Sequence, residues 1–273
     1  LMPNKNYVLD IPFFAKYLHN ELSQSMSNRS NIVKDYVFLC FFLGNDFLPH
    51  FPSLNIRTSG IEIIQEAYKK CARKSDFFLI DENNKIHWRN LKQLVIELSN
   101  MEYDNLLDEY DIRETRYSKP MKPRPDDNPA EFRLLNLPIR EREIEVYINP
   151  DEEGWEWRYY KSLFDIEVTE ELKKQICINY LEGLEWTLAY YTTGCKNWEW
   201  RYKYHYPPLL KDLVKYIPYF NTDFIVVKDK DPVSPLVQLS YVLPRAYLNL
   251  LPQNTQIKLM KDRPEWYKSE TRF

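Results

Sequence analysis

The hydrophobic positions of residues 29–44 recur at helical spacing and end at a glycine. Ser30 or Asn31 could cap the start of this predicted helix, and Gly44 suits the left-handed position that follows a helix. The predicted apolar face consists of Val33, Val37, Cys40 and Phe41, widened by Tyr36, Leu39 and Leu43. A strand over residues 36–43 is the alternative, because a short apolar run does not distinguish helix from strand.

The following 60 residues combine a second helical pattern with a turn and a third helix. The spacing predicts a helix from about Gly60 to Arg73. Its apolar positions are Ile61, Ile64, Ala67, Tyr68 and Cys71. Beyond it we expect a short strand over "FFLI", a turn at Asn83–Asn84, and a helix over residues 88–101.

A proline-rich stretch then interrupts the periodic pattern. Within residues 115–143 the run "KPMKPRPDDNP" holds four prolines, and Pro138 follows shortly. Proline removes backbone donors and restricts the residue before it, so this stretch predicts a linker or surface loop. We therefore divide the chain into residues 1–114, residues 115–143 and residues 144–273.

Two further helices are predicted after the proline-rich stretch. The first covers "EELKKQICINYLEGLEWTLAYYT", with Thr169 as its cap and Gly194 after its end. Its apolar positions are Ile176, Tyr180, Leu184, Leu188 and Tyr191. The second is bounded by Ser234 as N-cap, Pro235 at the first helical position and Pro244 beyond the end. The patterns together predict a mainly α-helical chain.

Composition narrows the possible classes of protein. The 273 residues are 44% hydrophobic, 28% charged and 15% aromatic, which is typical of a globular protein. Only five glycines occur and no glycine-rich phosphate loop is present. The four cysteines form no C-x-x-C pair, so we expect reduced thiols and an intracellular protein, with cytoplasm, nucleus and virion left open. No apolar run has the length of a membrane span.

Asp46 is the first candidate for chemistry, because it follows the helix-ending glycine by two residues. A carboxylate held at a sharply defined helix end suits Mg²⁺ or Mn²⁺. The alternative is that Asp46 caps the next turn while Asn45 adopts left-handed geometry. A site for phosphate chemistry would need several carboxylates to hold two ions, so Asp46 alone is not sufficient.

The segment Gly194–Leu210 is the second candidate, because it interleaves aromatic and basic residues. The residues concerned are Trp198, Trp200, His205 and Tyr206, with Arg201 and Lys203 between them. This mixture suits single-stranded nucleic acid, since rings stack on bases and cations meet phosphates. A buried aromatic plug is the alternative, and we expect the two roles to be mixed. The net charge of −3 argues against a generally basic surface, although a local basic face is compatible with it.

Taken together, these motifs resemble the XRN family of 5′→3′ exoribonucleases. The run "DYVFLCFFLGNDFLPHFPSLNIRTSGIEII" is similar to the end of the family's nuclease region. The runs "YLEGLEWTLAYYTTGCKNWEWRYKYHYPPLLKDL" and "SPLVQLSYVLPRAYLNLLP" are similar to its aromatic helical segment and to the segment after it. The three runs occur in the family's order.

The resemblance implies a flap-nuclease-like (PIN-like) α/β core, of which residues 1–114 would be the C-terminal part. It also implies that Asp46 is the last of the acids that hold two Mg²⁺ ions. Trp198 and Trp200 match the family's Trp-x-Trp and His205–Tyr206 its His-Tyr, so residues 144–273 would form a helical module that lines the path of single-stranded RNA.

The resemblance also has departures. The family's other metal-binding acids and its 5′-phosphate pocket precede Leu1, so we expect them on an N-terminal segment or a separate chain. Residues 58–60 are Thr-Ser-Gly, where the family has an acid and a glycine. Two alternatives stay open: a catalytically incomplete, XRN-like component that binds RNA or protein, viral proteins included, and a flap-type DNA endonuclease.

Overall fold

The computed structural model describes residues 8–22, 32–73, 77–118, 125, 128–135, 142–164, 167–228 and 230–262. These residues are mainly helical, as predicted, and their only strand-like pairing is a single antiparallel bridge between Ile80 and Ile86. The elements are α1 (Ile11–Leu22), α2 (Ile32–Cys40), η1 (Phe41–Leu43), α3 (Gly60–Ala72), α4 (Trp88–Ser118), α5 (Pro129–Leu135), α7 (Glu143–Ile148), α8 (Trp155–Phe164), α9 (Glu170–Thr192), α10 (Leu210–Tyr216), α11 (Pro235–Val242), η2 (Arg245–Leu250) and α12 (Gln253–Asp262). Within the described ranges no helix has the length and hydrophobicity that crossing a bilayer requires.

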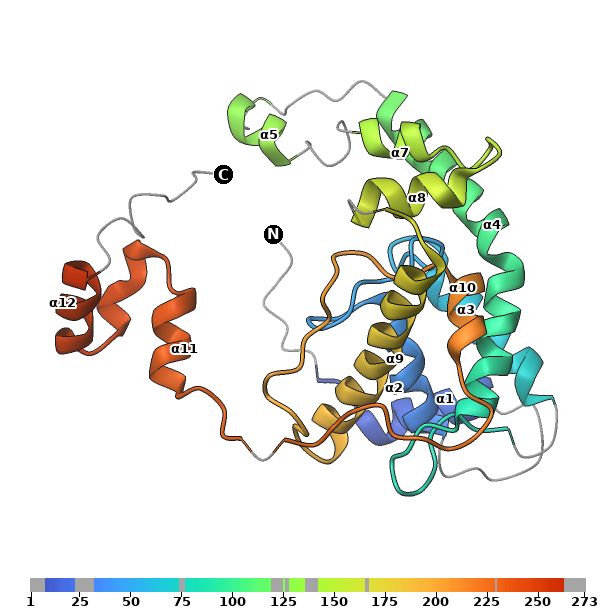
Figure 1. The fold of residues 1–273 in the computed structure, drawn as a ribbon, viewed down its shortest axis with the longest axis horizontal. Helices are drawn as coiled ribbons and strands as arrows, with labels where there is room; N and C mark the ends of the chain where they lie inside the picture. Colours follow the sequence, from blue (N-terminus) through green and yellow to red (C-terminus); the bar gives the residue numbers. More distant parts are fainter. Residues whose placement is uncertain are drawn as a thin grey trace.

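One large hydrophobic cluster joins helices from both sides of the proline-rich stretch (Figure 1). It contains side chains of α2, α3 and α4 together with side chains of α9 and α10. Glu102 of α4 strengthens this junction, because its carboxylate accepts hydrogen bonds from the backbone N–H groups of Leu210 (2.7 Å) and Lys211 (3.2 Å). These N–H groups belong to the first turn of α10, where a helix has no internal acceptors. Burial raises the pKa of Glu102 to about 7.

Helix α2 with η1 confirms the helix predicted over residues 29–44, and the alternative strand is wrong. The two predicted capping residues, Ser30 and Asn31, lie outside the described residues. The predicted apolar face is wrong in part, because Val33 and Val37 are exposed. The buried side of α2 carries Ile32, Asp35, Phe38 and Leu39 instead.

Asp35 explains this error. Its carboxylate is buried and accepts hydrogen bonds from the Tyr68 hydroxyl (2.6 Å) and from the N–H groups of Leu79 (3.0 Å) and Ile80 (2.8 Å). A buried carboxylate is tolerated when its oxygens are satisfied in this way. A sequence pattern counts aspartate as a solvent-facing position, which rotates the predicted face of the helix away from the observed one.

The third predicted helix is present, and it is longer than the prediction. Helix α4 begins at Trp88 as expected and continues to Ser118, well beyond residue 101. Its second half holds a buried carboxylate, Glu109, which accepts hydrogen bonds from Asn55 (2.9 Å) and Thr58. Before α4, residues 77–80 form no strand, only the bridge at Ile80, while Asn84 has the positive φ (58°) expected of the turn.

The predicted linker contains the end of α4 and the short helix α5 among its described residues. After it, α7 and α8 pack with the C-terminal half of α4 in a second, smaller hydrophobic cluster. Its buried members are Leu106, Ile148, Trp155, Tyr159, Tyr160, Ile176 and Leu209. The long helix α4 therefore contributes side chains to both clusters.

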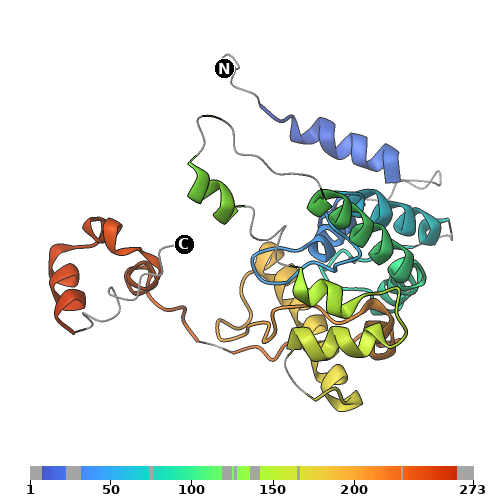
Figure 2. The same ribbon diagram turned by 90° about the horizontal axis from the view of Figure 1, so that it is seen from above.

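The two late helices are confirmed. The Thr169 hydroxyl accepts a hydrogen bond from the N–H of Leu172 (3.2 Å), and α9 ends before Gly194. Helix α11 begins at Pro235, although the Ser234 side chain makes no capping hydrogen bond. Figures 1 and 2 show α11 and α12 apart from the main body, and α11 has no buried residue.

Candidate functional site

The loop after η1 presents Asp46 to solvent and holds it by its neighbours. Gly44 ends the helix with φ 91°, in the region that favours glycine. The Asn45 side-chain oxygen accepts hydrogen bonds from the N–H groups of Phe47 (2.8 Å) and Leu48 (3.0 Å). Asp46 is exposed and has no hydrogen bond or ion pair within the described part of the chain. The alternative capping role of Asp46 is therefore wrong, since Asn45 closes the turn and Gly44 has the positive φ.

Asp46 is one carboxylate, and a metal site needs more ligands than one side chain supplies. The part of the chain that the structure describes contains no group of three or more His, Cys, Asp or Glu side chains that could hold a metal ion. The Asp46 carboxylate, exposed and unpaired on a fixed turn, can therefore supply one ligand to a metal ion. The metal-binding role of Asp46 remains a prediction.

Phe47 fixes the next position of the loop by inserting among aromatic rings of α9. Its ring lies edge-on to Trp186 (centroids 4.9 Å apart) and to Tyr190 (5.1 Å). Edge-to-face pairs at such distances are favourable beyond their buried area. The residue next to Asp46 is thus anchored on α9. The segment Gly194–Leu210, which we call the Trp-rich segment, follows this helix in the chain.

Three rings of this region form a stack, which we call the ring stack. Trp186 is stacked with Trp200 (5.2 Å, 25° between planes) and with Tyr190 (5.2 Å, 13°). Trp186 is buried, Trp200 is half-buried and Tyr190 is 38% exposed. Trp198 lies edge-on to Tyr190 at 6.4 Å and is 46% exposed. Trp200 therefore supports the stack, whereas Trp198 and Tyr190 reach solvent.

Beyond Trp200 the segment alternates between packed rings and exposed polar side chains. Tyr202 and Tyr204 are half-buried, while Arg201, Lys203 and His205 are exposed. Burial raises the pKa of Tyr202 well above its usual value, and its neutral hydroxyl donates to the carbonyl of residue 206 (2.8 Å). The expected mixture of roles is present: alternate rings are packed and the cations face outward.

Helix α9 brings the Asp46 loop and the Trp-rich segment to one point, Gly183. A Cβ atom on Gly183 would lie 2.5 Å from Leu48 Cδ2 and 2.9 Å from Trp200 Cη2. Leu48 and Trp200 can approach α9 this closely only because residue 183 has no side chain. The Glu182 carboxylate also accepts a hydrogen bond from Trp200 Nε1 (3.2 Å). Sequence reasoning missed this role, although an isolated glycine inside a helical pattern indicates close approach of a neighbour.

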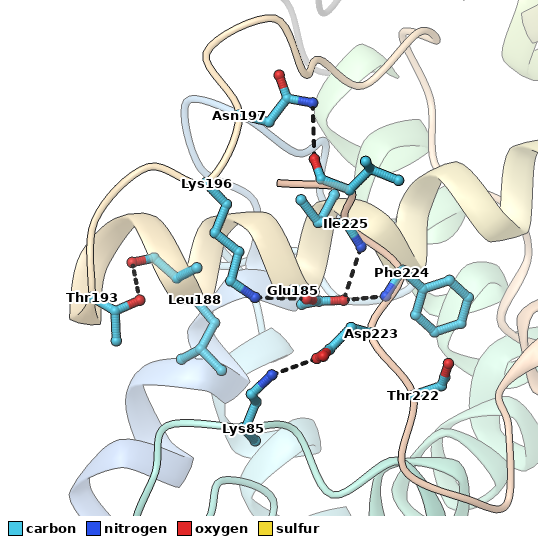
Figure 3. A network of polar contacts seen from close by, with 12 residues as sticks. Lys85, Glu185, Leu188, Thr193, Lys196, Asn197, Thr222, Asp223, Phe224 and Ile225 are labelled. Carbon is cyan, nitrogen blue, oxygen red and sulfur yellow. Dashed lines mark hydrogen bonds and ion pairs between the residues drawn. The ribbon is translucent and has the colours of Figure 1, made fainter. Parts of the chain in front are cut away.

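A buried carboxylate fixes the turn that leads into Trp198 (Figure 3). Glu185 of α9 accepts hydrogen bonds from Lys196 Nζ (2.8 Å) and from the N–H groups of Phe224 (2.6 Å) and Ile225 (3.3 Å). The next residue of α9 adds a second link, because Trp186 Nε1 donates to the carbonyl of Asn197 (2.8 Å). The residues on both sides of the turn are thereby tied to α9.

Three separate ion pairs, one to Asp223 and two to Glu199, satisfy the charges near this turn. Lys85 lies 2.5 Å from Asp223, and the hydrogen bond from Lys85 holds the pKa of Asp223 below its usual value (Figure 3). Hydrogen bonds from Lys228 and Lys230 lower the pKa of Glu199 to about 2. Arg201 and Lys203, in contrast, have no ion pair with any described residue.

His205 and Tyr206 line a different place, a cavity of about 730 Å³ bounded by α4, α7, α8 and the loop after Asp46. His50 lines the same cavity, although the sequence placed it in no site. The structure therefore brings the loop of Asp46 together with Trp198 and Trp200 through the rings of α9. It places His205 and Tyr206 at a neighbouring hollow.

Comparison with known proteins agrees with these motifs. The family model described as "Xrn1 helical domain" matches residues 26–133 and 139–269. The chain is 30% identical to a 5′-3′ exoribonuclease 2 homolog of Drosophila melanogaster, over 84% of this chain and 29% of that protein. It is 28% identical to 5′-3′ exoribonuclease 2 of Gallus gallus (90% and 33%) and 26% identical to that of Arabidopsis thaliana (90% and 32%). The chain thus spans about a third of the length of these relatives.

Proposed function

We propose that this chain, which belongs to the Xrn1 helical domain family, is part of a Mg²⁺-dependent 5′→3′ exoribonuclease. Its substrate would be single-stranded, 5′-monophosphorylated RNA, which it would degrade to mononucleotides. The names of the relatives, all 5′-3′ exoribonucleases, support the reaction class. The observation that carries the proposal is that the Asp46 loop and the Trp-rich segment both pack against the same face of α9.

In this proposal Asp46 is one ligand of a divalent cation, Mg²⁺ or Mn²⁺. The remaining acids would come from an N-terminal segment or a separate chain, which together with residues 1–114 would complete a PIN-like core. Bound cations would supply the charge that activates water and stabilises the leaving oxygen. The contribution of this chain is positional, because Gly44, Asn45 and Phe47 fix the direction in which Asp46 points.

Residues 144–273 would guide the RNA, and residues 115–143 would connect the two parts. Arg201 and Lys203 are exposed cations without ion pairs among the described residues, so they can meet phosphates. Trp198 is the exposed member of the Trp-x-Trp pair and can stack on a base. His205 and Tyr206 would contact the strand at the mouth of the neighbouring cavity.

Replacing Asp46 by alanine in the complete nuclease tests the metal role. We expect cleavage to fall more than 100-fold, since even outer-shell partners of metal ligands are worth about 10- to 100-fold. RNA affinity, measured separately by fluorescence anisotropy, should change little. Asp104→Ala is the matched control, because Asp104 is an exposed aspartate on α4. Equal cleavage by the two variants would refute the metal role.

A further inference from the structure

We propose that Tyr190 provides a base-stacking site for single-stranded RNA, at the solvent end of the ring stack and in contact with Phe47, the residue after Asp46. The inference rests on the proposed function, because it concerns how the same strand would be held. It adds a contact outside the Trp-x-Trp and His-Tyr motifs, and it assigns the inner tryptophan, Trp200, to support.

The position of Tyr190 in the ring stack is the first argument. Its ring is nearly parallel to that of Trp186, with 13° between the planes, and Trp186 is in turn stacked with Trp200. Of these three side chains, Tyr190 is the exposed one, with 38% of its surface accessible. A planar base that covers Tyr190 would extend a stack that is already formed, with little further ordering of the protein.

The rigidity of the ring is the second argument. Phe47 lies edge-on to Tyr190 at 5.1 Å, and Tyr191 lies edge-on to it at 5.6 Å. Together with the edge of Trp198, these neighbours limit rotation of the Tyr190 ring. An exposed aromatic ring that is fixed in this way resembles the stacking platforms that bind single strands without reading their sequence.

The charges on the segment Gly194–Leu210 are the third argument. Glu199 is the acid closest in sequence to Trp198, and its charge is balanced by Lys228 and Lys230. Arg201 and Lys203 on the same segment are exposed and have no ion pair with a described residue. Arg201 and Lys203 follow Trp200, at the opposite end of the ring stack from Tyr190, so a strand that runs along the stack from Tyr190 would bring its phosphates to them. At its Tyr190 end, the strand would lie beside Phe47, the residue after Asp46.

Trp200 is unsuited to the same role. Its indole N–H donates to Glu182 (3.2 Å), its ring is stacked on Trp186, and its edge touches the surface left free by Gly183. Trp200 is also half-buried, so a smaller fraction of its surface is open to a base than of Tyr190, which is 38% exposed.

Binding of a short single-stranded RNA to residues 1–273, measured by fluorescence anisotropy, tests the inference. We expect Tyr190→Ala to weaken binding about 5- to 140-fold, the range found when a stacking ring is replaced by alanine. Tyr190→Phe should bind within about twofold of the original chain, because it keeps the ring. Tyr103→Ala, which removes a 43% exposed ring of α4, is the matched control and should change binding by less than about twofold.

A photo-crosslink keeps the test decisive if Tyr190→Ala disturbs the fold. RNA carrying 5-iodouridine should crosslink to Tyr190 in the unchanged chain, as located by mass spectrometry. Crosslinks confined to other residues, equal affinities of the Tyr190→Ala and Tyr103→Ala variants, or no RNA binding by the original chain would each overturn the inference. The Asp46→Ala cleavage assay is independent of these outcomes, so the stacking site can fail while the nuclease assignment holds.

Discussion

Two aspartates eleven residues apart have opposite surroundings, and the contrast separates structure from chemistry. Asp35 is 1% exposed and accepts hydrogen bonds from a tyrosine hydroxyl and two backbone N–H groups. Asp46 is exposed and has no such partner among the described residues. The oxygens of Asp35 are fully engaged in hydrogen bonds that stabilise the fold. Asp46 is held in place by Asn45 and Phe47, and its own oxygens stay free. Only the second is available to a ligand.

The largest expected difference between the two is in stability. Asp35→Ala leaves three buried donors without their acceptor, so we expect the free energy of unfolding to fall by about 3–6 kcal/mol. Asp46→Ala should change it by less than about 0.5 kcal/mol, as for other exposed positions. Urea denaturation of both variants measures the difference. A similar loss in both would mean that Asp46 also has a structural role.

Glu102 extends the comparison to a buried carboxylate whose charge depends on pH. Burial raises the pKa of Glu102 to about 7, so the folded chain keeps its proton at pH values where the unfolded chain has lost it. Stability due to this group is therefore present below about pH 4.5 and lost as pH rises to about 7, by roughly 3 kcal/mol.

Denaturation of the original chain and of Glu102→Gln between pH 4.5 and 8 measures this effect. The glutamine variant should lack the part of the pH dependence that the carboxyl contributes. Two curves that run parallel across this range would show that Glu102 is ionised throughout.

The smallest effect is expected from Gly183→Ala, which disturbs Asp46 from a distance. The added Cβ would overlap Leu48 and Trp200, and overpacking of this kind costs about 1–3 kcal/mol. Because Leu48 belongs to the Asp46 loop, we expect the kcat for cleavage by the complete nuclease to fall. The KM should change less than the kcat. Adding Leu48→Ala should restore part of both stability and kcat. A Gly183→Ala variant with unchanged kcat would mean that the loop is positioned independently of α9.

The sequence predicted most of the helices because their ends carry local information. Thr169, Gly194 and Pro235 act within one turn of the backbone, and their predicted positions agree with the structure. The face of α2 and the length of α4 were mispredicted for one reason. Asp35, Glu102 and Glu109 are buried by partners more than 30 residues away in the chain, and no local pattern reveals such partners.

The candidate site also has one part that the sequence could predict and one part that it could not. The exposure of Asp46 follows from its position after a helix-ending glycine, and that was predictable. The ring stack was not, since Phe47, Trp186 and Trp200 meet only when α9 packs against the loop. Composition indicated that aromatic residues matter between Gly194 and Leu210, but only the fold distinguishes Trp200 as an inner ring from Trp198 as an outer one.

Helix α4 has a mechanical consequence. At about 1.5 Å per residue its 31 residues extend roughly 46 Å, and it supplies side chains to both hydrophobic clusters. Because one unbroken helix supplies both clusters, the two clusters are coupled. A displacement of α7 and α8 is transmitted to the loop contacts of Glu109 without passing through a hinge. The two clusters should therefore unfold together, as one cooperative unit.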